Sequence, residues 1–513
     1  MEIVIWRFRL FWHGDRVCYK AGTGVLMNLC EIIKNSAEKY GDRTAIVFYD
    51  RRISYADLYA DIRKFSAVVA GLEIEQGKRV ALALPNVPEY AIALFGALGA
   101  GAEIVSINPL YTPREIEHIL RDANVGLVIT HPMFEQSVRD ASRGAPVSLL
   151  YSDSLGDPAK TDIRKLISSV SSGIDPVDKA PDDTALIVYT NAYRGNSLGA
   201  CLTHEGLAFD AESCRQVASV NENDSFIATI PLFHAFALTV CMNLPLLTGA
   251  KTVFHEMFNE DRVVADIQKE RTTIFAAVPT VFKRIYDKYG KAGLDFSFVK
   301  AFISGGAPLS LNLWMDFCTA FNAKLYEGYG ITECGPVTSV NPINIVTCKP
   351  GSIGPPLNGI SVRIEDEEGN VLPPRTTGEL VIRGKNVMRE YLNQPEETAK
   401  FLRDGWLHTG DLAWMDEDGY IYITGHIKRL ILVGGFNVYP PEVEQVLSSY
   451  PGVRSCRVFG TSDESLGERV MAEVTAAPGA VLELPELRKF LKSKLAPYKA
   501  PRRIEIMESS PSR

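Results

Sequence analysis

Short apolar runs of strand length alternate with helical patterns through the first two thirds of the chain. This alternation predicts a mostly parallel sheet covered by helices on both faces, because each crossover returns a helix to the sheet surface. The runs are RVALALP (79–85), AEIVSIN (102–108), VGLVITH (125–131), TALIVYT (184–190), SFIATI (225–230), KTVFH (251–255), TTIFAAV (272–278) and FVKAFISG (298–305).

From about residue 351 the pattern changes to strand-forming segments separated by turns. SVRIEDEEGNVL, GELVIRG and LAWMDEDGYIYITG follow one another, and the Asp418-Gly419 pair in the last is typical of a hairpin turn. Adjacent strands without intervening helices favour antiparallel pairing. We therefore expect a small β-rich layer after the parallel sheets.

A smaller α/β segment follows that layer. We expect helices over about 441–449 and 484–495, with strands in RLILVGG, VRSCRVFG and RVMAEVTA. The predicted fold class is α/β, with a large N-terminal domain (27–427) of parallel-rich sheets and helices plus the β-rich layer. A small mobile C-terminal α+β domain (428–513) completes the predicted architecture.

Size and charge point to small molecules as partners. The chain has 513 residues, 46% of them hydrophobic, so it can bury a large core, and its length favours two or more domains. Its net charge of −8 arises from 54 basic and 62 acidic residues without a long block of like charge. Proteins that bind nucleic acid usually carry a basic patch, so no nucleic-acid partner is expected.

The sequence does not predict secretion, a zinc site or a membrane span. The nine cysteines are scattered without a C-x-x-C pair, which is typical of reduced packing residues in a cytoplasmic protein. Residues 1–26 are either an extension or the product of an upstream start site. Arg7 and Arg9 interrupt their apolar run, so a signal-peptide core is missing. No apolar run approaches the length of a transmembrane helix.

Two widespread nucleotide-binding motifs are missing. The sequence has no G-x-x-x-x-G-K-[ST] loop and no G-x-G-x-x-G fingerprint after a strand. Instead, the run 184–190 ends in a polar, glycine-containing loop, and a helical pattern begins near Thr203, whose hydroxyl is a suitable N-cap. A strand, a loop and a helix in this order predict an anion site.

Two neighbouring stretches carry the strongest functional signal. ISGGAPLS (303–310) precedes YEGYGITECGP (326–336). Glycines permit close approach of the backbone to a ligand, a threonine hydroxyl donates to phosphate, and a carboxylate suits Mg²⁺. For YGITE alone, a glycine-rich surface turn with a solvated glutamate is the alternative.

The chain resembles the adenylate-forming superfamily, which includes acyl-CoA synthetases, luciferases and peptide-synthetase adenylation domains. The resemblance rests on these two stretches together with PLFHAFAL (231–238) and WLHTGDLAWMDEDGYIYITGHIKRLILVGGFNVYPPEVE (406–444). It covers about residues 27–508, and the order and spacing of the motifs fit throughout. It implies sites for ATP or AMP, Mg²⁺ and CoA.

The resemblance also implies a role for each residue of the glycine-rich motifs. Thr332 binds the α-phosphate in the catalytic site, and Glu333 binds Mg²⁺. The residues implied to lie around the nucleotide base are Gly305, Gly306, Ala307, Tyr329 and Gly330.

The long stretch 406–444 spans the expected domain boundary. By resemblance, Asp411 accepts hydrogen bonds from both ribose hydroxyls, and Lys428 is the hinge of the catalytic rotation. His426 stands where the family usually has an arginine that contacts ribose and phosphate, and it is a weaker, pH-dependent substitute. Arg429 reverses the charge of the acidic position that ends this motif.

Two further motifs concern the thiol and the carboxylate. Gly434, Gly435 and Phe436 resemble a loop that swings in for the thioester step and lines the tunnel for the pantetheine arm of CoA; a plain hairpin turn is the alternative. The Phe233-His234 pair resembles the gate of the carboxylate pocket, with His234 near the acyl carboxyl. A satisfied core histidine is the alternative for His234.

The phosphate loop departs from the family pattern. The family reads approximately Y-T-S-G-T-T-G-x-P-K-G, whereas this chain reads YTNAYRGNSLG (189–199). Thr190, Arg194 and Gly195 remain as candidates to contact phosphate, but Leu198 replaces the lysine. Losing one well-placed donor typically costs ~10²–10³ in rate. The tail also reaches Arg513 before the adenylation lysine of the family, so we expect this chain to lack it.

The expected activity is that of an AMP-forming acid-thiol ligase. A carboxylate, by default a medium- or long-chain fatty acid, reacts with ATP and CoA through an acyl-adenylate to give acyl-CoA, AMP and diphosphate. One alternative is a catalytically impaired relative that binds nucleotide or acyl-adenylate without forming it. Another is an acyl-AMP ligase that loads a carrier protein. The resemblance also implies a homodimer.

Overall fold

The structure, a computed structural model, describes residues 28–72, 77–145, 147–157, 159–191, 197–343, 346–427, 430–463 and 465–507. The extension 1–26 and three predicted site residues lie outside the described residues: Arg194, Gly195 and Lys428.

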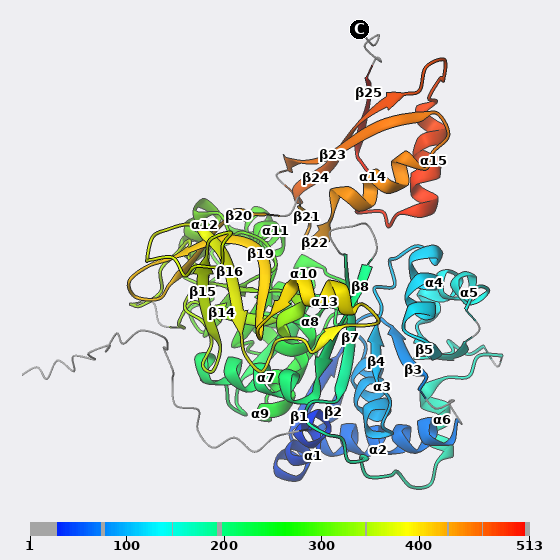
Figure 1. Cartoon of the computed structure of the whole chain (residues 1–513). Helices are drawn as coiled ribbons and strands as arrows, with labels where there is room; N and C mark the ends of the chain where they lie inside the picture. The colour runs from blue at the N-terminus through cyan, green and yellow to red at the C-terminus, as the bar shows by residue number, and fades with distance from the viewer. Residues whose placement is uncertain are drawn as a thin grey trace, which may run out of the picture.

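An eight-stranded sheet forms one half of the large N-terminal domain (Figure 1). Its inner strands are parallel, and only the edge strands β14 and β2 are antiparallel to their neighbours. In spatial order the strands are β14 (Val337–Val340), β13 (Leu325–Gly330), β12 (Ala301–Ser304), β11 (Ile274–Ala277), β9 (Ser225–Ala228), β10 (Lys251–Phe254), β1 (Thr44–Phe48) and β2 (Arg51–Ser54).

A seven-stranded sheet forms the other half. Five of its strands, from β7 to β6, are parallel, and the hairpin partner β8 and the short β17 extend it antiparallel. In spatial order the strands are β17 (Glu390–Tyr391), β8 (Ser197–Thr203), β7 (Thr184–Asn191), β4 (Ile104–Ser106), β3 (Arg79–Ala83), β5 (Val125–Thr130) and β6 (Ser148–Tyr151).

Helices cover these sheets, and the largest core cluster joins residues of both. Helix α3 is buried along its whole length, as expected for a helix that is apolar on all sides. The helices are α1 (Leu29–Tyr40), α2 (Tyr55–Gly71), α3 (Pro88–Gly99), α4 (Pro113–Asp122), α5 (Glu135–Ser142), α6 (Ile163–Ser169), α7 (His204–Ala218), α8 (Ala235–Ala237), α9 (Leu244–Thr248), α10 (Glu260–Lys269), α11 (Pro279–Tyr289) and α12 (Leu311–Phe321), with a π-helix over Leu238–Asn243.

The predicted β-rich layer is confirmed. Its strands are all antiparallel, and the Asp418-Gly419 turn joins the last two of them. They are β15 (Ser361–Glu365), β16 (Gly378–Arg383), β18 (Leu402–Arg403), β19 (Trp406–Met415) and β20 (Ile421–His426), with α13 (Pro395–Phe401) beside them.

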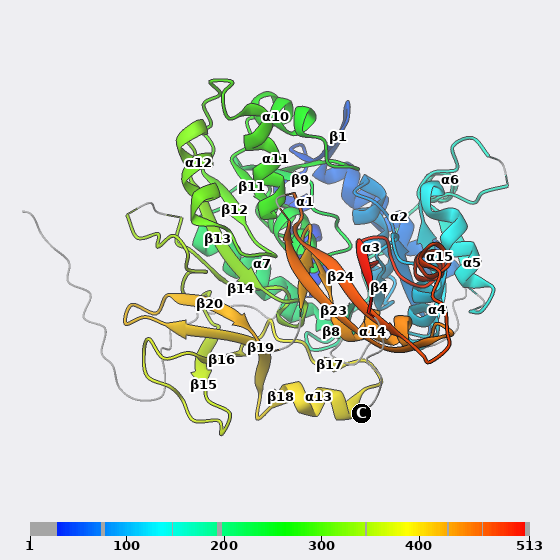
Figure 2. The ribbon, with the colours of Figure 1, turned by 90° about the horizontal axis from the view of Figure 1, so that it is seen from above.

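The described residues from 430 onward form a small α+β body, here called the C-terminal unit. Figures 1 and 2 show it, in orange to red, over α4 of the large domain. Two helices pack on one sheet around an apolar core of their own. Its elements are β21 (Ile431–Val433), β22 (Phe436–Val438), α14 (Pro440–Ser448), β23 (Val453–Asp463), β24 (Gly467–Ala476), α15 (Leu484–Lys494) and β25 (Arg503–Met507).

One strand was not predicted from the sequence. The segment 197–203, expected to belong to the loop before the helix, is strand β8, which pairs with β7 along its length. Helix α7 begins only after it, and the Thr203 hydroxyl caps that helix by accepting from the Gly206 amide at 3.0 Å. The cap is therefore confirmed. The helix N-terminus does not directly follow the loop, because the seven residues of strand β8, roughly 20 Å, precede it. The anion site itself stays a prediction, since residues 192–196 lie outside the described residues.

No helix within the described part of the chain is both long and apolar enough to cross a membrane.

Candidate functional site

A cavity of about 450 Å³ lies where the large domain meets the C-terminal unit. The end of β13 and the 3₁₀ helix that follows it (Thr332–Cys334) form one side, and β19 and β20 of the β-rich layer form another. The turn between β21 and β22 closes the cavity from the C-terminal unit. Segments that follow the carboxyl ends of parallel strands are common positions for ligand sites.

Glu333 is held by hydroxyl groups from two other parts of the large domain. Its Oε1 accepts a hydrogen bond from the Tyr391 hydroxyl at 2.8 Å and one from the Thr190 hydroxyl at 3.1 Å. Burial and the nearby Glu333 carboxylate raise the pKa of Tyr391 well above its ordinary value. The phenol therefore keeps its proton and acts as a donor, which fixes the orientation of the carboxylate.

Asp411 lies on β19 with a donor on each of its oxygens. His426 Nδ1 is 2.6 Å from Oδ1, and the Tyr329 hydroxyl donates to Oδ2. The hydrogen bond to Asp411 raises the pKa of His426, and burial raises that of Tyr329. A carboxylate has about four acceptor positions, so Asp411 can still accept hydrogen bonds from a ligand.

The glycine turn after β12 separates two cavities. Gly306 has φ of +77°, a left-handed conformation that glycine adopts without strain, and it faces both cavities. Glu327 lies beside this turn and accepts from the Leu309 amide at 3.1 Å. Burial raises the pKa of Glu327 to about 7, so near neutral pH this carboxyl is partly protonated.

His234 lies deep in the cavity, between aromatic rings of the two bodies. Its ring centroid is 4.6 Å from that of Phe233 and 5.4 Å from that of Phe436 in the C-terminal unit. Burial lowers the pKa of His234 to about 4. The imidazole is therefore neutral at physiological pH and can accept a hydrogen bond from, or donate one to, a ligand.

The hairpin turn expected as the alternative for Gly434-Gly435 is present, whereas the role of this pair in the thioester step stays a prediction. The pair is a two-residue hairpin turn between β21 and β22, and Gly435 also lines the cavity. A Cβ atom at Gly435 would lie 2.8 Å from Val278 Cγ1 of the large domain, so only glycine fits this approach. Phe436 stacks on Tyr498, with centroids 4.5 Å apart and planes at 24°.

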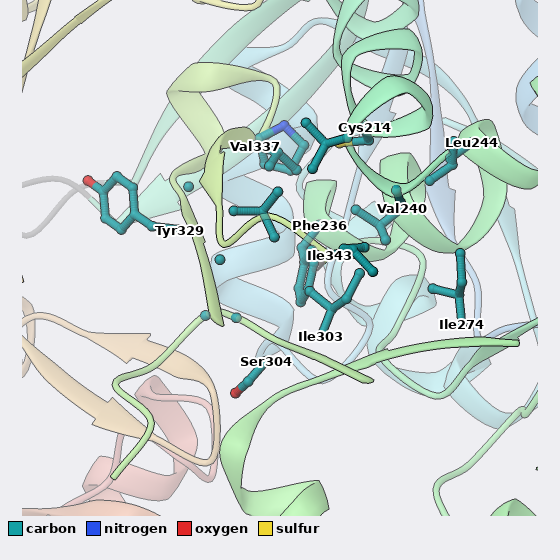
Figure 3. Close-up of a pocket in the computed structure, with 18 residues that line it drawn as sticks. Cys214, Phe236, Val240, Leu244, Ile274, Ile303, Ser304, Tyr329, Val337 and Ile343 are labelled. Carbon is teal, nitrogen blue, oxygen red and sulfur yellow. The ribbon is translucent and has the colours of Figure 1, made fainter. Parts of the chain in front are cut away.

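A second, smaller cavity of about 80 Å³ adjoins the first and has an almost entirely apolar wall. Figure 3 shows the hydrocarbon side chains gathered around it, whereas the Tyr329 hydroxyl points away. The residues that line both cavities are Phe236, Gly306, Gly328, Tyr329, Gly330 and Pro336. The apolar side chains of this smaller cavity are Val217, Ala218, Phe236, Val240, Leu244, Ile274, Ile303, Pro336, Val337, Val340 and Ile343.

The structure brings most of the predicted site residues together. Gly305 lines the apolar cavity, and Gly434 lies in the hairpin turn without lining the larger cavity. The predicted residues that line the larger cavity are Thr190, His234, Gly306, Ala307, Tyr329, Gly330, Thr332, Glu333, Asp411, His426, Gly435 and Phe436.

Sequence reasoning missed several residues of the site. Tyr391 lies 58 positions from the Glu333 carboxylate that it contacts, and Tyr439 and Tyr498 reach the cavity from the C-terminal unit. No local spacing indicates such contacts. The PLFHAFAL motif contained a usable signal, because Phe236 is two positions beyond the predicted His234 and lines both cavities.

The larger cavity is poor in positive charge. None of its lining residues in the described ranges is lysine or arginine, whereas Glu327, Glu333 and Asp411 are acidic. The described residues also contain no cluster of three or more metal-ligating side chains. A single carboxylate beside two hydroxyl-bearing threonines fits Mg²⁺, which usually takes one or two protein carboxylates and completes its shell with phosphate and water oxygens.

Comparison with known families shows where this chain belongs. Residues 33–392 match the AMP-binding enzyme family, and residues 442–513 match the AMP-binding enzyme C-terminal domain. The chain belongs to the AMP-binding enzyme family. Its members are adenylate-forming ligases, so the resemblance drawn from the motifs is confirmed.

Relatives within the AMP-binding enzymes bear the names of several acid-CoA ligases. A long-chain-fatty-acid--CoA ligase of Bacillus subtilis is 33% identical over 94% of this chain and 91% of its own length. A feruloyl-CoA synthase of Amycolatopsis sp. is 32% identical over 91% of this chain and 93% of its own.

Two solved complexes of one AMP-binding enzyme differ in how closely they match this chain. A double mutant of the o-succinylbenzoate CoA synthetase of Bacillus subtilis, bound to its product analogue OSB-NCoA, matches 94% of this chain and 95% of its own with a TM-score of 0.84 and 26% identity. The same enzyme in complex with the acyl-adenylate intermediate OSB-AMP matches with a TM-score of 0.71 at equal coverage and identity. This chain therefore matches the product-analogue complex more closely.

Proposed function

We propose that this protein is an AMP-forming acid-CoA ligase for carboxylic acids with an unsubstituted hydrocarbon tail. The observation that carries the proposal is the apolar cavity, which adjoins the cavity that contains Thr332, Glu333 and His234. The apolar cavity of about 80 Å³ would take the part of the tail nearest the carboxylate, which would then lie at the shared wall, beside these polar groups.

The reaction has two steps. The carboxylate oxygen attacks the α-phosphorus of ATP, which forms acyl-adenylate and releases diphosphate. The thiol sulfur of CoA then attacks the acyl carbon, loses its proton and expels AMP. Effective catalysis of both steps requires donors that are already oriented where charge develops.

The proposed roles follow the positions of the side chains. Asp411 accepts hydrogen bonds from the ribose, and the Thr332 hydroxyl donates to the α-phosphate. Glu333 holds Mg²⁺, which would neutralise phosphate charge when bound. His234 is neutral because of its burial, so it can orient the acyl carboxylate without forming a competing ion pair. Gly435 and Phe436 form the wall along which the pantetheine arm of CoA would enter.

The domain boundary at 427/428 and rotation about Lys428 are part of the same proposal. The separate core of the C-terminal unit supports it, because a body with its own core can move as a unit. The cytoplasmic location and the homodimer that the resemblance implies remain predictions, to be checked by cell fractionation and by analytical ultracentrifugation.

Composition of the cavity wall supports the choice of substrate. It offers no charged side chain among the described residues, and its polar groups include the Cys214 thiol and the Ser304 hydroxyl. A carboxylate on the tail would lose its hydration there with only the Ser304 hydroxyl and the Cys214 thiol as partners. A buried polar group without adequate partners costs ~1–3 kcal/mol or more. Octanoate or dodecanoate should therefore be preferred over ferulate or o-succinylbenzoate.

The test is a set of acids assayed for diphosphate release and, by mass spectrometry, for the CoA ester. Val240→Phe fills the apolar cavity and should shift preference to shorter acids. Val481→Phe is the control, because Val481 is 83% exposed on the C-terminal unit. Equal activity on ferulate and dodecanoate, or an unchanged preference in Val240→Phe, would refute the proposed substrate class.

A second candidate is a relative that binds acyl-adenylate without forming it. The absence of lysine and arginine from the described cavity wall favours it, as does Leu198 at the family's lysine position. Binding of a dodecanoyl-AMP mimic without diphosphate release would support this candidate. Thioester formation on a carrier protein but not on CoA would instead support the acyl-AMP ligase alternative.

A further inference from the structure

Lys499 is a buried cation between the C-terminal unit and the large domain. Its side chain is 1% exposed. Its Nζ lies 2.6 Å from Glu115 Oε1 on helix α4 and 2.7 Å from Glu442 Oε1 on helix α14. The Tyr111 ring of the large domain lies under the same ammonium, 4.8 Å from Nζ. One side chain therefore joins two helices that belong to different bodies.

The large-domain side of this contact is rigidly built. Glu115 Oε2 accepts from the backbone amide and the hydroxyl of Thr112, both at 2.8 Å, which completes the capping box of α4. Its other oxygen is thus directed at Lys499. Burial opposes the positive charge, but Glu442, Tyr111 and Glu115 together raise the pKa of Lys499, so the ion pair persists at physiological pH.

The contact is continuous with the wall of the larger cavity. Tyr498, the residue before Lys499, stacks on Phe436, and the Phe436 ring faces His234. Tyr111 and Tyr498 themselves line the cavity. A shift of Lys499 away from α4 would therefore displace the aromatic wall beside the proposed carboxylate site.

We propose that Lys499 and Glu115 form an interdomain clasp that holds the C-terminal unit in its thioester-forming position. Both are positioning residues, because they act through Tyr498, Phe436 and Gly435 and do not touch the reacting atoms. The closer match to the product-analogue complex supports this assignment of the position. The proposal rests on the proposed function.

The clasp also allows the C-terminal unit to separate from the large domain. Glu442 Oε2 is buried without a hydrogen-bond partner, so the closed state leaves one carboxylate oxygen unsatisfied. Opening would hydrate that oxygen together with Lys499. Two bodies that must separate in each catalytic cycle need a contact of this kind, which orders them without making separation prohibitively slow.

The experiment compares Glu115→Gln with Glu117→Gln. Glutamine can keep the capping box at position 115 through its amide oxygen but removes the charge that faces Lys499. Glu117 lies on the same helix and pairs with Arg121 at the surface, 2.9 Å away, so its substitution leaves the interface intact. Lys499→Met provides a second, independent break of the clasp.

Each half-reaction is measured separately in the full-length protein. We expect Glu115→Gln and Lys499→Met to slow CoA-ester formation from supplied dodecanoyl-AMP by about ten- to a hundredfold, with the release of diphosphate little changed. Glu117→Gln should retain both rates. Equal slowing of both steps in Glu115→Gln, or no slowing of either, would overturn the clasp.

Hydrogen exchange without ligand separates failure of the clasp from failure of the proposed function. Faster exchange in α4 and the 433–438 hairpin of Glu115→Gln, relative to Glu117→Gln, is expected whether or not the protein makes acyl-CoA. Unchanged exchange in both segments would refute the clasp. If the wild-type protein forms no thioester, the proposed function fails while the exchange result still decides the clasp.

Discussion

Asp411 lines a cavity, although both of its oxygens already accept hydrogen bonds from protein donors. The donors orient the carboxylate before any ligand arrives, which reduces the entropy lost on binding. The resemblance places its partner His426 where the family usually has an arginine, which predicts a titratable charge at this position in place of a permanent one.

Nucleotide affinity should therefore depend on pH through His426. Because Asp411 raises the pKa of His426, the imidazolium persists above about 6.5, the usual value, and is lost as the pH rises through the raised pKa. The stabilising ion pair with Asp411 is lost over the same interval. We expect calorimetric affinity for the dodecanoyl-AMP mimic to weaken by roughly tenfold over this interval.

His426→Arg tests this dependence directly. The guanidinium stays charged at all accessible pH values, so the affinity of this variant should be flat where that of the wild type falls. A wild-type profile that is already flat would exclude His426 as a charged ligand of the nucleotide.

Glu333→Gln should separate metal chemistry from folding. The amide oxygen can still accept from Tyr391 and Thr190, so the free energy of unfolding should change little, whereas the rate of diphosphate release should fall by about 10²–10³-fold. Glu390→Gln is the control because Glu390 is exposed on the neighbouring strand β17. A normal rate with an unchanged Mg²⁺ requirement in Glu333→Gln would rule out Glu333 as the metal ligand.

At this scale, sequence could predict residues that lie in compact motifs. Gly306 lies in one short motif, and Thr332 and Glu333 lie in another. Each has a chemical type that suits its predicted contact with the nucleotide or the metal. Tyr391 could not be predicted, because its contact with Glu333 depends on β17 pairing with β8 at the edge of a different sheet. Such long-range pairing leaves no spacing in the sequence.

At the scale of elements, the β7–β8 hairpin is the feature that differs most from the sequence-based expectation. Parallel strands such as β3, β5 and β9 were found close to their predicted ranges because they are continuous apolar runs bounded by turns. Strand β8 has the sequence SLGACLT, in which glycine and small residues weaken the strand signal. Pairing with β7 and burial against the core form this strand nonetheless.

The hairpin also predicts where a lysine could be restored. Leu198 is directly opposite Thr190 in the β7–β8 ladder, and directly opposed residues share a face of the sheet. Leu198→Lys would therefore place an ammonium on the sheet face that carries Thr190, whose hydroxyl donates to Glu333. We expect diphosphate release to rise by about tenfold, at a cost in unfolding free energy of roughly 1–3 kcal/mol from burying the charge.

Ser197→Lys is the matched control for this gain. It adds the same charge to the neighbouring residue, whose side chain points to the opposite face of the strand. Equal gains in the two variants would mean that only the net charge matters, and no gain in Leu198→Lys would show that the substituted lysine does not reach the phosphates.

At the scale of the whole molecule, the larger cavity belongs to neither body alone. The large domain supplies Glu333 and Asp411, while the C-terminal unit supplies the glycine turn and the aromatic wall. The alternation of strands and helices predicted both bodies, because each has its own apolar periodicity. It could not predict their contact, which depends on single side chains such as Val278 against Gly435.

Gly435→Ala should disturb this contact selectively. The added methyl group would clash with Val278 and strain a residue whose φ is +88°, so the CoA-dependent step should slow by about 10²-fold with little effect on diphosphate release. Gly434→Ala should slow the CoA-dependent step less, because the added Cβ would meet only Leu466 Cδ2 at 3.6 Å. Equal losses would indicate that backbone strain, and not the approach to Val278, limits the step.

A wall shared between two bodies also makes ligand binding and domain association thermodynamically reciprocal. Any ligand that contacts both sides of the cavity must strengthen the association of the C-terminal unit with the large domain by the same factor by which that association strengthens its own binding. Acyl-adenylate and CoA would then bind cooperatively beyond their direct contact at the reacting carbon, and departure of either would weaken the binding of the other. Release of the first product should therefore speed release of the second.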